Sequence, residues 1–148
     1  MPFDPARYEF RCETPAVDDY RRLRAVAGLS VKSEAAALRG LPNTLRAVVV
    51  FHEGRAVAMG RVVGDGGCHC QIVDMAVEPA HQGQGIGRRI VGDLVAWLHE
   101  NAPDTAYVSL IADGEAHRLY AEFGFRPVAP ASIGMALWVG GYPGRADG

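Results

Sequence analysis

Three glycines alternate in the stretch Gly83-Gln84-Gly85-Ile86-Gly87, between an apolar strand pattern and an amphipathic helix pattern. Glycine lets the backbone approach a ligand closely, and the first amides of a helix have no partner within the helix. Together with the positive end of the helix dipole, these amides form an anion site that suits a phosphate or pyrophosphate. The neighbouring Arg88 and Arg89 add positive charge. The sequence therefore predicts a strand, a phosphate-binding loop and a helix, in that order.

Two common kinds of phosphate loop do not fit. A P-loop needs Lys followed by Ser or Thr after its last glycine, and Arg88 and Arg89 stand there instead. A dinucleotide-binding loop that starts at Gly83 needs glycine at position 88. It also needs an acidic residue at the end of the next strand, and Asp104 falls in the loop before that strand. The ligand is therefore expected to be another kind of phosphate compound.

The patterns on either side of this loop predict an α+β fold with a mixed, mostly antiparallel sheet and helices on both faces. Strands are expected at 8–12, 47–51, 55–63, 70–77, 107–111, 126–128 and 134–139, and helices at 14–28, 33–41, 87–101 and 115–123. The strand–helix–strand unit within 70–111 predicts a right-handed parallel crossover. A single domain is expected over 1–139. The glycine-rich residues 140–148 are expected to form a flexible tail.

Composition narrows the class of protein. The 148 residues suit one domain, and 49% hydrophobic with 22% charged residues excludes a disordered chain. A net charge of −2 leaves little room for a nucleic-acid-binding face, and no apolar run is long enough for a membrane span. No signal peptide pattern is visible, and three cysteines are an odd number, so we expect a cytoplasmic protein. Cys68-His69-Cys70 could suggest a zinc site, but no second group of ligands occurs elsewhere in the sequence. An ordinary strand segment is therefore favoured there, and no metal is expected.

Two spaced motifs identify a family. Gln82-Gly83-Gln84-Gly85-Ile86-Gly87 resembles the Gln/Arg-x-x-Gly-x-Gly/Ala loop of the GNAT superfamily of N-acetyltransferases. Ala116-x-x-Leu119-Tyr120-x-x-x-Gly124-Phe125 resembles a second signature of that family, at the expected separation. The resemblance covers residues 8–139.

The resemblance implies acetyl-CoA as co-substrate and direct attack by an amine in a ternary complex, without a side-chain nucleophile. The pyrophosphate would lie on the loop, and the pantetheine arm would add to the preceding strand like an extra strand. Asp113 stands where many members have an Asn near the pantetheine or acetyl group. The expected donor-binding residues are Met75, Ala76, Val77, Gln82, Gly83, Gln84, Gly85, Ile86, Gly87, Arg88 and Asp113.

Tyr120 is the expected general acid that protonates the leaving thiolate, because the family's motif places its tyrosine near the donor sulfur. By residue type alone, a core tyrosine packed beside Leu119, Phe123 and Phe125 would be the simpler interpretation. The motif favours the catalytic one.

The proton acceptor is more open. An alkylamine with a pKa of about 10 is neutral in about one molecule in a thousand at pH 7. Deprotonating the ammonium at that pH therefore costs about 4 kcal/mol if no group helps. The position that relatives often use for a base falls on Gln71, which cannot take a proton and is expected to bind substrate. Asp74, in an apolar strand, is expected to be catalytic or to bind the amine, against the alternative of a hydrogen-bonded structural carboxylate. Glu34 is a second acceptor-site candidate, and His117 a third.

The predicted function is acetyl transfer to a small primary amine, either an aromatic monoamine or a polyamine. A protein or peptide amine is the alternative acceptor, and a non-catalytic acyl-CoA-binding module is the alternative class. A homodimer through the apolar residues 134–139 is possible. The charged side chains Arg21, Arg22 and Arg24 are expected on a solvated helix face.

Overall fold

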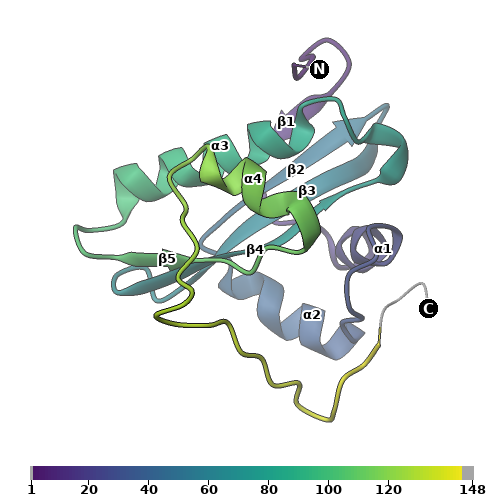
Figure 1. Ribbon diagram of the computed structural model, residues 1–148. Helices are drawn as coiled ribbons and strands as arrows, with labels where there is room; N and C mark the ends of the chain where they lie inside the picture. The colour runs from purple at the N-terminus through teal and green to yellow at the C-terminus, as the bar shows by residue number, and fades with distance from the viewer. Residues whose placement is uncertain (1, 145–148) are drawn as a thin grey trace.

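In the part of the chain that the structure describes, the sheet has five strands in the order β1-β2-β3-β4-β5 (Figure 1). The computed structural model describes residues 2–144. The strands are β1 (Glu9–Arg11), β2 (Arg46–His52), β3 (Arg55–Gly64), β4 (His69–Val77) and β5 (Tyr107–Ser109). Neighbouring strands from β1 to β4 pair antiparallel, and β5 pairs parallel with β4. The predicted α+β fold with a mixed sheet is confirmed.

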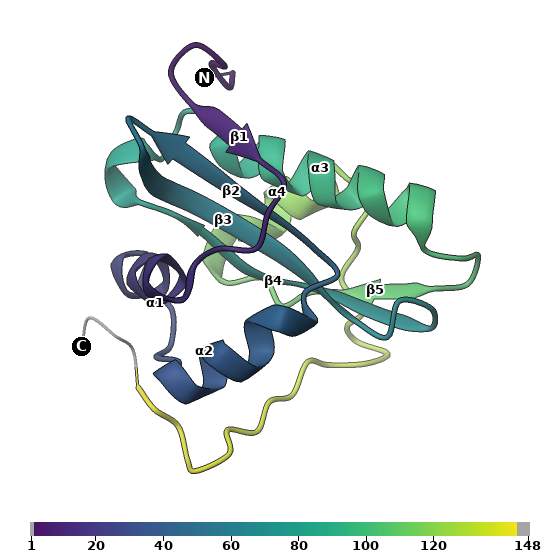
Figure 2. The ribbon, with the colours of Figure 1, turned by 180° about the vertical axis from the view of Figure 1, so that it is seen from behind.

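Helices cover both faces of the sheet (Figures 1 and 2). α3 (Ile86–Asn101) packs on one face, with α4 (His117–Ala121) beside it, and α1 (Val17–Val26) and α2 (Glu34–Gly40) lie on the other. Short 3₁₀ turns stand at Leu41–Asn43, Pro79–His81 and Gly114–Ala116. In residues 2–144, no helix is both long enough and apolar enough to cross a membrane.

Alternation along β2 divides the core into two layers. Val48 and Val50 pack in the cluster that includes the apolar stripe of α3, whereas Val49 packs with α1 and α2. Successive strand residues point to opposite faces, so one strand supplies both layers. The stripe predicted for α3 is buried throughout its length, and it consists of Ile86, Ile90, Leu94 and Leu98.

β4 contains a bulge that shapes the site. Met59 of β3 lies opposite Ala76, and Arg61 lies opposite Val73. Between these two pairs, β4 therefore contains one residue more than β3. Asp74 lies in the bulge with φ of +60°, a left-handed conformation that Asp tolerates better than most residues. The bulge therefore bends β4 in the middle.

β4 also separates from β5 halfway along its length. The parallel ladder ends at Gln71 and Ser109, although β4 continues to Val77. The amide of Glu78 donates to the carbonyl of Val57 in β3 (2.8 Å). Because strand amides alternate, the amides of Val77 and Met75 point away from β3, toward the side where β5 no longer pairs.

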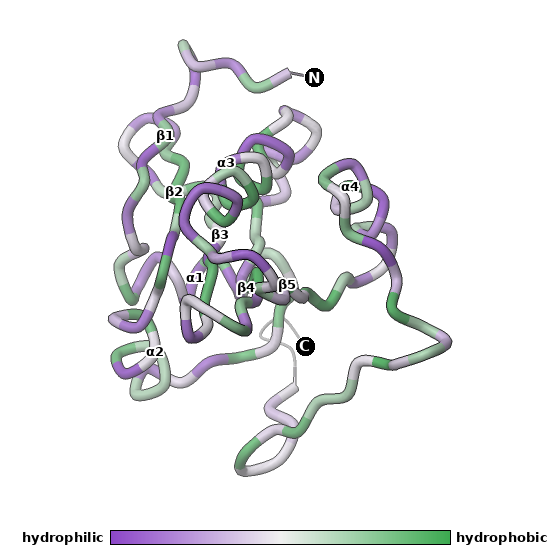
Figure 3. The backbone as a smooth tube through the Cα atoms, turned by 90° about the vertical axis from the view of Figure 1, so that its left-hand side faces the viewer, coloured by the Kyte–Doolittle hydropathy of each residue, from purple (hydrophilic) through white to green (hydrophobic). Residues whose placement is uncertain are grey.

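The predicted closing strands at 126–128 and 134–139 are wrong. Residues 122–144 instead run as irregular chain from α4, past β5, to the side of α1 and α2 (Figures 1 and 3). β5 offers only three residues to pair with, and Pro127 and Pro130 have no amide for a ladder. The last helix is also shorter than predicted, since residues 114–116 form a 3₁₀ turn.

The expected tail at 140–148 lies partly outside the described residues, which end at 144. Near that end, the amide of Val31 donates to the carbonyl of Gly144 (3.3 Å). The expectation that these residues form a flexible tail stays a prediction.

Replacing Gly60 by Ala tests the packing behind the bulge. A Cβ there would lie 2.5 Å from Sδ of Met75 and 2.7 Å from Cγ2 of Ile90. We expect Gly60→Ala to lower the free energy of unfolding by about 1–3 kcal/mol in chemical denaturation, because the core must shift. Gly40→Ala is the control, since its Cβ would meet nothing within 4 Å. Equal stability of the two variants would contradict this account.

Candidate active site

A cavity of about 850 Å³ opens where β4 leaves β5. Its walls come from β4, from α1 and the loop after it, from α4, and from the C-terminal segment. Five residues that the sequence singled out line this cavity: Gln71, Asp74, Met75, Asp113 and Tyr120. Residues far apart in the sequence therefore meet at the opened edge of one strand.

Tyr120 is buried, with 8% of its surface exposed. Its ring packs edge-on against Phe125, with the ring centroids 6.1 Å apart. Burial raises the pKa of the Tyr120 hydroxyl above its ordinary value, and the charge of Asp113 raises it further. The hydroxyl therefore carries its proton at neutral pH, as a general acid must.

Asp74 is held by three donors. Its Oδ1 accepts from the hydroxyl of Tyr20 (3.0 Å) and from Nη1 of Arg24 (2.5 Å), and its Oδ2 accepts from Nε of Arg61 (2.8 Å). Burial and the charge of Asp74 raise the pKa of Tyr20 to about 12, so that Tyr20 is the donor at neutral pH. These contacts fit the alternative that Asp74 is a hydrogen-bonded structural carboxylate. Proton transfer by Asp74 stays a prediction.

The expectation that Arg24 lies on a solvated face of α1 is wrong. This side chain is only 9% exposed. In addition to its contact with Asp74, it donates two hydrogen bonds to the carbonyl of Ser30, from Nε (3.0 Å) and from Nη2 (2.8 Å). Arg22 is also partly buried and donates to the carbonyl of Ala56 (2.7 Å). The reason is that α1 packs across β3 and β4, which turns this face toward the sheet. A carboxylate in an apolar strand requires a counter-ion, so Asp74 itself was the sequence signal that a buried arginine such as Arg24 would lie beside it.

The glycine loop presents free amides at the start of α3. Gly83 and Gly85 both have φ of +77°, which favours glycine. The first bond of the helix runs from the amide of Arg89 to the carbonyl of Gly85 (3.1 Å), so the amides of 86–88 have no acceptor within the helix. Nε2 of Gln82 donates to the carbonyl of Val77 (3.2 Å), which ties the loop to the end of β4.

The two arginines after the loop already have partners. Nη2 of Arg88 lies 3.0 Å from Oε2 of Glu122, in an exposed ion pair. The guanidinium of Arg89 lies over the ring of Phe10, 3.9 Å from its centroid. An exposed pair is weak, so Arg88 can be drawn to a phosphate at little cost.

The structure does not bring every candidate into the cavity. Glu34 lies exposed at the start of α2, and His117 lies exposed on α4; neither lines the cavity. Sequence reasoning missed Tyr20, Lys32, Arg61 and Trp138, which do. They come from four separate segments, and no local spacing connects them.

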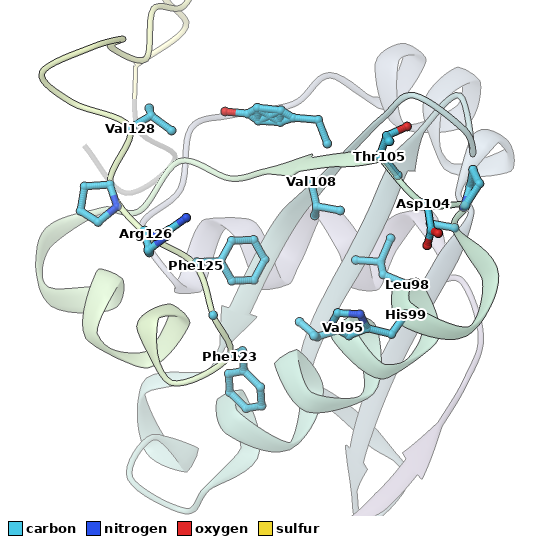
Figure 4. A pocket seen from close by; sticks show the side chains of 16 residues that line it. Val95, Leu98, His99, Asp104, Thr105, Val108, Phe123, Phe125, Arg126 and Val128 are labelled. Atoms are coloured by element: carbon cyan, nitrogen blue, oxygen red, sulfur yellow. The ribbon is translucent and has the colours of Figure 1, made fainter.

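A second cavity of about 660 Å³ lies between α3, β5 and residues 123–128 (Figure 4). Apolar side chains such as Leu98, Val108 and Phe125 point into it. None of the residues predicted for the site lines it. The first cavity is therefore the candidate active site.

Residues 43–127 match the model of the acetyltransferase (GNAT) domain, over more than half of the chain. This chain belongs to the GNAT acetyltransferase family. A probable acetyltransferase from methicillin-resistant Staphylococcus aureus has a similar structure, with a TM-score of 0.85 and 42% identity. That match covers 89% of this chain and 99% of the other.

Two plant proteins show how relatives differ in acceptor. Chloroplastic serotonin N-acetyltransferase 2 of rice is 35% identical over 85 residues, and histone acetyltransferase TAP1 of soybean is 30% identical over 84. Each match covers 57% of this chain, but only 42% of the rice protein and 35% of the soybean protein. This GNAT chain thus spans less than half the length of these relatives.

Asp74→Asn tests the charge at the bulge. Asn suits the positive φ of this position, so the change removes the charge and leaves the backbone unstrained. Because two buried guanidiniums would lose their counter-ion, we expect a loss of about 3–5 kcal/mol in the free energy of unfolding. The control is Asp93→Asn, whose partner Arg46 is partly solvated, and it should cost clearly less. Native stability of Asp74→Asn would show that the charge is not structural.

Proposed function

We propose that this protein transfers an acetyl group from acetyl-CoA to the primary amine of a small molecule, by direct attack in a ternary complex. The observation that carries the proposal is that the protonated Tyr120 and the opened part of β4 line one cavity. Membership of the GNAT family supports the reaction type. The limited volume of the cavity, about 850 Å³, favours a small acceptor over a protein chain, although a relative is named a histone acetyltransferase.

The loop and the strand would share the work of binding the donor. The amides of residues 83–88 would bind the pyrophosphate at the positive end of α3. The outward amides of Met75 and Val77 would pair with the pantetheine arm, which fills the place that β5 leaves open. The thioester would then lie at Met75, where a backbone amide can stabilise the negative oxygen that forms during attack.

Tyr120 would donate its proton to the leaving thiolate. Its raised pKa keeps the proton available in the ground state, and its position in the same cavity as Met75 suits this role. Asp74 would act as a positioning residue that holds Arg24 and Arg61, because three donors already occupy its two oxygens. Gln71 would contribute hydrogen bonds to the acceptor.

The charges in the cavity favour one of the two expected acceptors over the other. Arg24, Arg61 and Lys32 line it, against Asp74 and Asp113. A polyamine is disfavoured by this positive balance. An amine with an aromatic or apolar body remains compatible, since Leu29, Ile72 and Trp138 also line the cavity.

Tyr120→Phe should lower kcat about 100-fold with little change in affinity for acetyl-CoA, because it removes the acid and keeps the ring. Release of coenzyme thiol from acetyl-CoA with a panel of amines measures this. Tyr107→Phe, at an exposed position of β5, is the control and should keep its kcat. If no amine in the panel supports thiol release by the native protein, the result contradicts the proposed reaction and favours the alternative of a non-catalytic binding module.

Gly85→Val should abolish binding of acetyl-CoA, because its side chain would occupy the place of the pyrophosphate. Backbone strain alone would accompany any Val at positive φ, so Gly54→Val is the matched control. Gly54 has φ of +80° in the β2–β3 turn with open space around it. Titration calorimetry should find binding by the control and none by folded Gly85→Val. Unchanged affinity in the loop variant would place the donor elsewhere.

A further inference from the structure

A smaller cavity adjoins the acceptor cavity. It has a volume of about 220 Å³ and lies among α1, α2 and β3. It shares three lining residues with the larger one, namely Tyr20, Lys32 and Arg61. Two of these three carry positive charge, so the junction of the two cavities is cationic.

One hydrogen-bond donor of Arg61, Nη2, is left unused at this junction by the residues that the structure describes. Its Nε donates to Asp74 and its Nη1 to Oγ1 of Thr44 (2.5 Å), but its Nη2 makes no hydrogen bond to any residue within 2–144. The side chain is only 9% exposed. No fully buried side-chain nitrogen or oxygen of the described residues lacks a partner, so Nη2 must be reachable from the cavities that Arg61 lines.

The surrounding charges leave this donor uncompensated. Asp74 already faces both Arg24 and Arg61, and Asp113 acts on Tyr120 at the donor end of the cavity. Lys32 is exposed and forms no ion pair with another described residue. A buried guanidinium with a free N–H, next to an unpaired ammonium, is an arrangement that binds the oxygens of an acid.

We propose that the acceptor amine carries an acidic group, a carboxylate or a phosphate, which binds between Arg61 and Lys32. This deepens the proposed function, on which it rests. The amine would then point toward Met75 and Tyr120, and the body of the acceptor would lie against Ile72 and Trp138. The substrate class is therefore an amino acid or a phosphorylated amine, rather than the simple cation that Asp74 alone suggested.

Binding of matched acetylated products tests this without turnover. Titration calorimetry compares N-acetylphenylalanine with N-acetylphenethylamine, and N-acetylglucosamine 6-phosphate with N-acetylglucosamine. Within at least one pair the acid should bind at least about tenfold more tightly, because a charge-assisted contact is worth more than about 1.4 kcal/mol. The pair that shows the preference separates carboxylate from phosphate. No preference in either pair, including no binding at all, overturns the proposal.

Lys32→Ala locates the contact. It should reduce the preference for the acid at least about threefold, a modest effect because Lys32 is exposed and screened by salt. Arg39→Ala, on an exposed position of α2 outside both cavities, should leave the preference unchanged. An unchanged preference in Lys32→Ala, or an equal loss in Arg39→Ala, overturns the assignment.

Thiol release with the corresponding free amines separates the two proposals. Preferred binding of acids without turnover of any amine contradicts the proposed function and keeps the acid site. Turnover that favours phenethylamine over phenylalanine, and glucosamine over its 6-phosphate, contradicts the acid site and keeps the acetyl transfer.

Discussion

The buried carboxylate of Asp74 holds together three parts of this protein. It lies in the bulge of β4, and it binds Arg24 and Tyr20 of α1 and Arg61 of β3. A buried charge is costly unless it is paired, and here the pairing also fixes where α1 lies on the sheet. The same contacts hold Arg24 and Arg61 at the wall of the cavity. One interaction thus links the bend of a strand to the electrostatics of the site.

The bend has a consequence at the other edge of β4. Pairing with β5 stops at Gln71, whereas the strand runs on to Val77 and leads into the glycine loop. A strand with unpaired outward amides and a helix start with free amides therefore follow each other in the chain. Gly60 allows this arrangement, since any side chain there would collide with Met75 and with Ile90 of α3. The donor site we propose uses both sets of amides.

Local patterns predicted the parts of the fold that depend on local physics. The apolar stripe of α3 and the alternating glycines act within a few residues, and the structure has them. The position of Tyr120 came from a motif resemblance, and the structure places it in the cavity. The partners of Asp74 were not predicted, because Tyr20, Arg24 and Arg61 are 54, 50 and 13 residues away in the chain. The strand expected at 134–139 failed for the same reason, since a run of apolar residues cannot supply the neighbour that a strand must pair with.

Hydrogen exchange of single amides in the presence of acetyl-CoA tests the central claim, that the opened edge of β4 receives the donor. The amides of Met75 and Val77 should be slowed strongly by saturating acetyl-CoA, because they would gain acceptors. The amide of Glu78, already bonded to Val57, should change little by comparison. Slowing confined to the glycine loop, with Met75 and Val77 exchanging as in the free protein, would contradict the account.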